Sequence, residues 1–339
     1  MPCPPKMWLR WTTAAAAFFV RCPKSLRRLP TGAQDAILPH MRLIALYGVL
    51  AVNLFAADFT PFDYDRTLPL DPHEHEISVL KGTRVALLNF AVTPSVRADG
   101  LLVTPPPGRT KTGAIVWVHS SGVFQQLPDA MLLAQAGAVS LLINPIGPNW
   151  DQPAAETWRG PMINAVVSIR RGVDLLLQRS DVDPQRLGFA GHSYGAMMGI
   201  DAVSSDRRFK AAVFEVGLPG MSVHLRTAPI PFAADIRKRL GPGLDSALSF
   251  IEPLDAIHYV GSLASIALLF QSAHLDPGVT DAQAQTLFDA ASEPKTLKWY
   301  DTAHDVVDIA AISDRARFLA THLGLKRIDP ILKAKIGVR

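Results

Sequence analysis

A short run in the middle of the chain, Gly191–Gly195, has the composition of a site for nucleophilic catalysis. It reads Gly-His-Ser-Tyr-Gly, with Ser193 at its centre. In a tight turn of this kind the serine hydroxyl is raised at the end of a strand, and the two glycines stand where side chains would collide. Five residues of this pattern can occur by chance, so the flanking sequence must decide what the run means.

The flanking sequence predicts a strand, then the turn, then a helix. Residues 186–191 (RLGFAG) are a short apolar run that suits a buried strand, and residues 196–203 (AMMGIDAV) suit a helix. This is the setting that a nucleophile elbow requires. A serine hydroxyl also needs a base to take its proton and an acid to orient that base, so Ser193 predicts a histidine and a carboxylate elsewhere in the chain.

The segment VDPQRLGFAGHSYGAMMG, residues 182–199, resembles the α/β-hydrolase superfamily, in particular its dienelactone-hydrolase and prolyl-oligopeptidase branch. The resemblance extends over about residues 60–324; it is specific at the elbow and looser elsewhere. It implies a mostly parallel central sheet with helices on both faces. It also implies that nucleophile, acid and histidine follow one another in this order along the chain.

His304 is the residue that the resemblance indicates as the base. It lies in WYDTAHDV, between a predicted strand (296–300) and a predicted last helix (about 305–324). Three other histidines are less suited to the role. His322 falls within that predicted helix, whereas His258 and His274 precede the predicted acid and break the expected order.

Asp276 is the predicted acid, because it follows the predicted strand 265–271 in the turn SAHLDPGV, which is similar to the superfamily's G-x-x-D-x-x-V. Asp301 and Asp305 are close neighbours of the histidine in sequence and are badly placed to orient its ring from behind. Asp255 comes before the strand rather than after it. A plain turn aspartate before Pro277 is the alternative interpretation of Asp276.

The oxyanion formed during acyl transfer needs two backbone N–H groups aimed at it. Tyr194, directly after the nucleophile, is expected to supply one. The other is expected from the segment His119–Gly122 (HSSG), which resembles the superfamily's H-G-G-G type, and by position we assign it to Ser121. Ser120 stands where the superfamily has a glycine, so the backbone there has less freedom.

Strand and helix patterns alternate along the body of the chain, which predicts a sheet with helices on both faces. Strands are predicted at 77–92 and 99–106, antiparallel at one sheet edge, and at 113–120, 138–145, 186–191, 211–216, 265–271 and 296–300. Helices are predicted at 162–179, at 280–292, where Thr280 and Gln283 form a capping-box pattern, and at about 305–324. Residues 217–262 interrupt the alternation and are either an inserted lid or ordinary connecting helices.

The front of the chain differs from the rest. Residues 1–57 hold seven basic residues, one acidic residue and both cysteines, so the other 282 residues carry a net charge of −2 and no cysteine. Residues 1–40 are rich in proline and arginine, and we interpret them as an extension ahead of the true start at Met41; the alternative is that residues 8–20 are part of an extended signal. Residues 41–57 have the charged start, apolar run and small final residues of a signal peptide, with an uncleaved membrane anchor as the alternative.

Charge and composition exclude other classes of function for the domain at 58–339. A nearly neutral domain gives no reason to expect nucleic-acid binding, and the chain lacks a phosphate-binding or dinucleotide fingerprint. His73 and His75, in DPHEHE, could face a metal together, but a metal site needs three or four ligands, so a solvated edge strand is the better interpretation. We therefore expect no cofactor and no metal. Trp150 and Trp158 are expected near the pocket, as lining or as packing anchors.

The sequence thus predicts an exported, periplasmic or secreted serine hydrolase that cleaves a small carboxylic ester and keeps no stable membrane insertion. A serine peptidase of prolyl-oligopeptidase type is the first alternative, although the chain has no room for the large propeller domain that usually gates such enzymes. A binding protein that kept the fold without catalysis is the second. An intact Ser193, Asp276 and His304 in the expected order argues against the second alternative.

Overall fold

The computed structural model describes residues 57–108, 110–152 and 156–337. The predicted extension 1–40 and all but the last residue of the predicted signal peptide 41–57 lie outside the described residues. Among the described helices, none is both long enough and apolar enough to cross a membrane.

The described residues form a nine-stranded sheet whose order is β1-β2-β3-β5-β4-β6-β7-β8-β9. The pairs β1–β2, β2–β3 and β3–β5 are antiparallel, whereas the six strands from β5 to β9 in the sheet order are mutually parallel. The predicted, mostly parallel α/β-hydrolase sheet with an antiparallel edge is therefore confirmed. The strands are β1 His73–Leu80, β2 Thr83–Ala91, β3 Arg97–Thr104, β4 Thr112–His119, β5 Val139–Ile143, β6 Val182–His192, β7 Phe209–Glu215, β8 Ala267–Ala273 and β9 Lys295–Tyr300.

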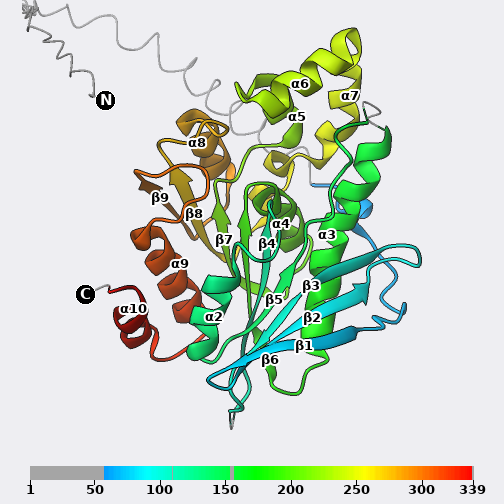
Figure 1. Cartoon of the computed structure of the whole chain (residues 1–339). Helices are drawn as coiled ribbons and strands as arrows, with labels where there is room; N and C mark the ends of the chain where they lie inside the picture. Colours follow the sequence, from blue (N-terminus) through cyan, green and yellow to red (C-terminus); the bar gives the residue numbers. More distant parts are fainter. Residues whose placement is uncertain (1–56, 109, 153–155, 338–339) are drawn as a thin grey trace, which may run out of the picture. The chain divides into compact units, whose positions relative to one another are not determined.

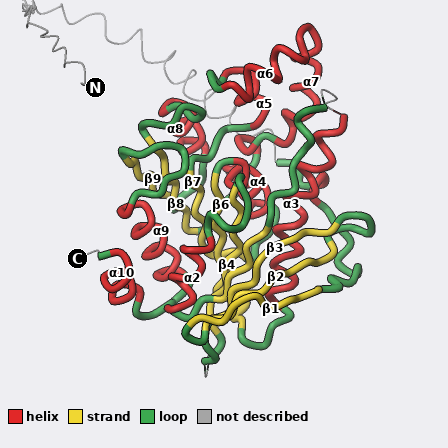
Figure 2. The backbone as a smooth tube through the Cα atoms, viewed as in Figure 1, coloured by secondary structure: helices red, strands yellow, loops and turns green. Residues whose placement is uncertain are grey.

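Both faces of the sheet are covered by helices, as Figure 2 shows with the strands running between helices. Strand β4 illustrates why, because Val116 and Val118 enter one buried cluster while Ile115 and Trp117 enter the other. A strand that is apolar on both faces is buried only between two helical layers. The first cluster includes residues of α3 (Glu156–Leu177), α4 (Tyr194–Ser204) and α8 (Asp281–Ala290), and the second those of α2 (Leu127–Gln135), α9 (Ile309–His322) and α10 (Ile328–Ile336).

The prediction of one strand over residues 77–92 is wrong, because these residues contain a hairpin turn. Lys81 and Gly82 both have positive φ, and they join β1 to β2 as a two-residue loop. Such loops match the right-handed twist of the strands they connect. Strand β1 lies at the sheet edge and is exposed along its whole length, which confirms the edge-strand interpretation of His73 and His75.

Residues 217–262, between β7 and β8, contain three short helices and four turns of 3-10 helix. The helices are α5 (Met221–Thr227), α6 (Pro231–Leu240) and α7 (Leu244–Ile251). In Figure 1 they stand together beyond the ends of β7 and β8, and α7 contacts the helix α3. They therefore occupy the end of the sheet to which the sequence assigns the chemistry.

The helix that follows the predicted acid begins as its sequence indicates. Thr280 Oγ1 accepts a hydrogen bond from the backbone N–H of Gln283 (3.2 Å), and Gln283 Oε1 accepts one from the N–H of Thr280 (3.1 Å). This capping box satisfies two N–H groups that a helix start leaves without partners. The capping residue Thr280 lies only four residues after Asp276, so the start of α8 is fixed close to the predicted acid.

Candidate active site

The turn at Ser193 is a nucleophile elbow in its backbone geometry. Strand β6 ends at His192, α4 begins at Tyr194, and Ser193 between them has φ 55° and ψ −115°. A positive φ in a residue that is not glycine is costly and persists only where the surroundings hold it. Here the N–H of Ser193 donates to the carbonyl oxygen of Glu215 in the neighbouring strand (2.9 Å), and the Ser193 carbonyl accepts from the first turn of α4.

The two flanking glycines are required because the backbone approaches them closely. A Cβ added to Gly191 would lie 2.6 Å from the carbonyl oxygen of Gly195, and one added to Gly195 would lie 2.0 Å from the carbonyl oxygen of Val118. Both obstacles are backbone atoms that cannot rotate away. The glycine spacing of the sequence pattern therefore has a steric origin in this fold.

We predict that Gly195→Ala lowers the free energy of unfolding by about 2–3 kcal/mol, the upper part of the range for an overpacked site. The matched control is Gly160→Ala on α3, where an added Cβ meets nothing within 4 Å. That variant should be as stable as the parent or gain up to about 1 kcal/mol. Urea unfolding of both variants measures the difference, and equal stabilities would contradict the steric argument.

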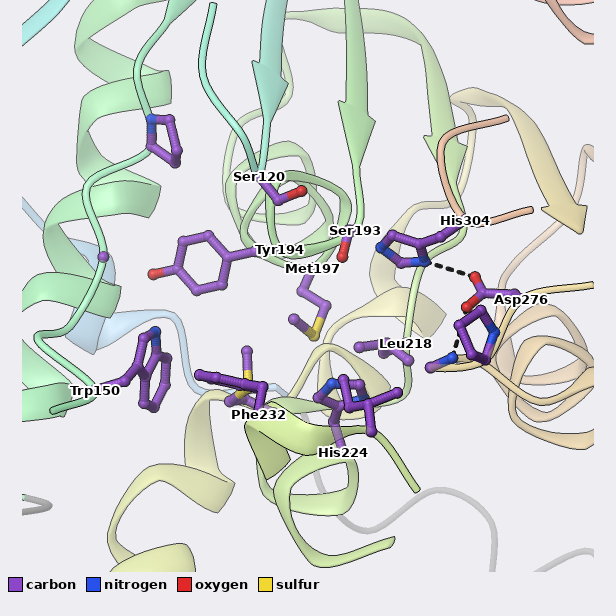
Figure 3. Close-up of a pocket in the computed structure, with 16 residues that line it drawn as sticks. Ser120, Trp150, Ser193, Tyr194, Met197, Leu218, His224, Phe232, Asp276 and His304 are labelled. Carbon is purple, nitrogen blue, oxygen red and sulfur yellow. Dashed lines mark hydrogen bonds and ion pairs between the residues drawn. The ribbon is translucent and has the colours of Figure 1, made fainter. Parts of the chain in front are cut away.

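A cavity of about 470 Å³ opens beside the elbow, and Ser193, Asp276 and His304 all line it. Figure 3 shows Ser193 beside the His304 ring, on the side of the ring away from Asp276. The structure thus brings together three predicted residues that come from β6–α4, the loop after β8 and the loop after β9.

The histidine and the acid form a directed pair. Nδ1 of His304 lies 2.6 Å from Oδ2 of Asp276, whose side chain is fully buried while that of His304 is one-third exposed. Oδ1 of Asp276 accepts from the backbone N–H groups of Gly278 (2.7 Å) and Val279 (3.0 Å). Burial raises the pKa of Asp276, but these hydrogen bonds and the imidazole outweigh it and lower the pKa below its usual value. Asp276 is therefore an anion that can orient His304 and stabilise its protonated form.

A buried ion cluster, which the sequence analysis missed, supports the loop that carries His304. The guanidinium of Arg315 binds both carboxylate oxygens of Asp129 (3.2 and 3.0 Å) and lies 3.3 Å from the Glu215 carboxylate. It also donates to the carbonyl oxygen of Val306 (3.1 Å), two residues after His304. Burial raises the pKa of Glu215 to about 7. Arg315 thereby ties α2, β7 and α9 together beneath the site.

The two predicted oxyanion donors are placed differently. The N–H of Tyr194 is at the first position of α4, where a helix has no internal acceptor, and Tyr194 lines the cavity. The N–H of Ser121 instead donates to Nδ1 of His119 (3.0 Å). It is Ser120, not Ser121, that lines the cavity, so the structure does not bring the predicted second donor to the site.

Two stacked histidines, His119 and His192, were also not predicted from the sequence as part of the site. The rings of His119 and His192 are parallel within 3° and 3.9 Å apart, and both residues are buried. Burial, with His192 alongside, lowers the pKa of His119 to about 3, and burial lowers the pKa of His192 to about 4. The sequence shows only that His192 lies inside the elbow motif; its place beside His119 follows from the parallel register of β4 and β6.

These shifts predict a loss of stability in mild acid. A histidine with a depressed folded pKa contributes fully above the unfolded value of about 6.5, and the contribution is lost as pH falls toward the folded pKa. From pH 7.5 to pH 5.5, the free energy of unfolding of the parent should fall by about 1.4 kcal/mol more than that of His192→Phe. Urea titrations of parent and variant at both pH values test this; an unchanged pH dependence would contradict it.

The alternative histidines are engaged elsewhere. Each contacts a partner that does not line the cavity: His322 packs on Phe318, His258 pairs with Glu252, and His274 pairs with Asp281. Of the alternative acids, Asp255 accepts from Ser222, while Asp301 and Asp305 are exposed. Within the described part of the chain, no cluster of three or more histidine, cysteine or acidic side chains could hold a metal ion.

The rest of the cavity wall is largely apolar. Trp150 and Phe232 meet edge to face, with ring centroids 5.9 Å apart, and Figure 3 shows them across the cavity from His304. Trp158 is fully buried and packs behind Trp150, so of the two tryptophans one lines the cavity and the other is a packing anchor. The remaining apolar lining comes from Pro145, Met197, Leu218, Met221, Ile230 and Pro277.

Comparison with solved structures relates the fold to hydrolases. The acetyl xylan esterase of Paenibacillus sp. R4 superimposes with a TM-score of 0.65 at 17% identity, over 75% of this chain and 90% of that one. Acetyl xylan esterase 1 of Thermoanaerobacterium sp. JW/SL YS485 gives 0.65 at 15% identity, over 79% and 92%. The acylaminoacyl peptidase of Pyrococcus horikoshii gives 0.59 at 18% identity, over 75% of this chain but 44% of that one. At these identities the likeness shows the fold.

The strand order, the elbow at Ser193 and the similarity to solved hydrolase structures together define an α/β-hydrolase of the serine hydrolase class. The sequence profile of the prolyl oligopeptidase family matches residues 127–306, more than half of the chain. The chain belongs to that family, and the resemblance inferred from the elbow sequence is confirmed. Comparison with curated proteins finds no sequence match.

Proposed function

We propose that this protein hydrolyses carboxylic esters through an acyl-enzyme intermediate. The observation that supports this most directly is the position of Ser193 beside a hydrogen-bonded His304–Asp276 pair, in a cavity whose other walls are mostly apolar. A base held by a buried carboxylate is the arrangement that activates a serine.

The reaction follows from the positions of these groups. Ser193 Oγ attacks the ester carbonyl carbon while His304 takes its proton, and Asp276 stabilises the resulting imidazolium. The N–H of Tyr194, at the positive end of α4, stabilises the negative carbonyl oxygen. His304 then gives the proton to the departing alcohol. Water repeats the same steps on the acyl-enzyme, which releases the acid and restores Ser193.

The similarity to acetyl xylan esterases supports ester cleavage over peptide cleavage. Two such esterases superimpose on this chain with TM-scores of 0.65, against 0.59 for the acylaminoacyl peptidase. A panel of p-nitrophenyl esters and dipeptide amides tests the preference. We expect turnover of the esters with little or none of the amides; efficient cleavage of the amides would favour a peptidase instead.

We also propose that the protein is exported after cleavage near Ala57. The second of the two units into which the chain divides begins at Ala57, where the apolar run of the predicted signal peptide ends. N-terminal sequencing of the protein secreted by an expressing cell should find Asp58 or a close neighbour first. A mature protein that begins before residue 41 would contradict both the start at Met41 and the cleavage.

The apolar cavity predicts a preference for a larger acyl group. Trp150→Ala should lower kcat/KM for p-nitrophenyl hexanoate about tenfold, because each buried methylene loses about 0.8 kcal/mol of contact. It should change kcat/KM for the acetate less than about twofold, since the acetyl group stays near Ser193. Phe250→Ala, which removes a half-exposed ring outside the cavity lining, is the matched control. Equal effects on both esters would contradict an acyl site at Trp150.

A further inference from the structure

His192 has contacts that the proposed mechanism does not use. It is the residue before the nucleophile, it is 1% exposed, and its ring is held between two others. The parallel ring of His119 lies 3.9 Å away on one side, and the His304 ring meets it at 76° with centroids 4.9 Å apart. A side chain held this closely has one orientation available for hydrogen bonding.

The two ring nitrogens of His192 each have a partner in a different loop. Nε2 lies 2.7 Å from the backbone carbonyl oxygen of His304, and Nδ1 lies 3.2 Å from Oγ of Ser120. A carbonyl oxygen only accepts, so Nε2 carries a proton and donates. Burial lowers the pKa of His192 to about 4, so the ring is neutral near pH 7 and Nδ1 must accept from the Ser120 hydroxyl.

These bonds connect three parts of the site through one rigid ring. The elbow supplies the ring, the loop after β9 supplies the His304 carbonyl, and the loop after β4 supplies Ser120, which lines the cavity. His119 adds to this by accepting the N–H of Ser121 at Nδ1 (3.0 Å), which holds the same loop from the next residue. The backbone of the base is therefore tied to the residue adjacent to the nucleophile.

We propose that His192 is a positioning residue that sets the distance between the His304 ring and the Ser193 hydroxyl by holding the His304 carbonyl. This rests on the proposed function, in which Ser193 and His304 react. A displacement of about 1 Å between reacting groups costs about 10²-fold in rate. The bond from Nε2 should therefore matter for kcat far more than for substrate binding.

Three substitutions separate the two hydrogen bonds. His192→Gln places an amide N–H near the position of Nε2, so it can still donate to the His304 carbonyl. His192→Asn places its amide near the position of Nδ1, so it can accept from Ser120 but is too short to reach the carbonyl. His192→Phe keeps a flat ring against His119 and removes both bonds. Active-site titration with a fluorophosphonate counts the reactive molecules in each preparation, so kcat is expressed per reactive site.

With p-nitrophenyl acetate, we expect His192→Phe and His192→Asn to lower kcat per site about 10²-fold while KM stays within about threefold. His192→Gln should recover at least tenfold over both. The proposal is overturned if Gln and Asn are equally impaired, or if Phe retains kcat within twofold of the parent. If His192→Phe does not fold, the comparison of His192→Gln with His192→Asn still tests the positioning role.

The parent enzyme separates this proposal from the proposed function. If the unmodified protein neither reacts with the fluorophosphonate nor hydrolyses esters, the proposed function fails and the positioning role fails with it. If the parent is active and the His192 variants are as active as the parent, only the positioning role is rejected.

Discussion

Ser193→Ala should lower kcat for p-nitrophenyl acetate by about 10⁶-fold, the size of the loss when the serine of a Ser-His-Asp protease is removed. Ser193 supplies the hydroxyl beside His304, and a methyl group has no oxygen to attack the ester. The Tyr194 N–H and the cavity remain, so a small rate above that of water is expected to persist.

The measurement combines ester turnover with labelling by a fluorophosphonate, which reacts only with an activated serine. Ser249→Ala is the matched control, because Ser249 is an exposed serine on α7 whose hydroxyl bonds within its own helix. The control should label and turn over substrate like the parent. Labelling or undiminished turnover in Ser193→Ala would show that another residue is the nucleophile.

The elbow could be predicted from sequence because its determinants are local. A short apolar strand, two glycines four residues apart and a following helix are all visible within residues 182–203. The steric requirement that the structure shows at Gly191 and Gly195 is the same one that makes the pattern recognisable. Asp276 and His304 were found through chain order and through their places after predicted strands, and the parallel sheet brings those strand ends to one edge.

Features that depend on register or on loop conformation could not be predicted in the same way. The stacking of His119 on His192 needs the pairing of β4 with β6, which a single sequence does not display. The choice between Ser120 and Ser121 at the cavity wall depends on whether the N–H of Ser121 turns toward His119. Likewise, the hairpin at Lys81 and Gly82 was hidden because the apolar pattern on both sides reads as one continuous strand.

The buried cluster around Arg315 was missed for a different reason. Its members, Asp129, Glu215 and Arg315, come from three separate elements, and each in isolation reads as a surface charge of a helix or strand end. Buried charges are tolerated only when they are paired and hydrogen-bonded, so their burial follows from tertiary packing. The sequence therefore indicates the candidate reacting groups but not the side chains that support their loops.

The role of Asp276 leads to the second large effect. Asp276→Asn should lower kcat for p-nitrophenyl acetate by about 10⁴-fold with the fold intact, because an amide has nearly the shape of the carboxylate but lacks its charge. An amide N–H facing Nδ1 of His304 would leave the proton on the other ring nitrogen, the one that must accept from Ser193. The Gly278 and Val279 N–H groups can still donate to the amide oxygen, so the turn itself should survive.

Asp305→Asn is the matched control, since Asp305 is an exposed acid next to His304 in sequence and was a rival for the same role. Its turnover should stay within about threefold of the parent. If Asp305→Asn lost activity and Asp276→Asn kept it, the acid would have to be reassigned, despite the 2.6 Å contact of Asp276 with His304. If both variants were inactive, circular dichroism and urea unfolding would separate a collapsed loop from lost chemistry, because only the chemical explanation predicts native stability for Asp276→Asn.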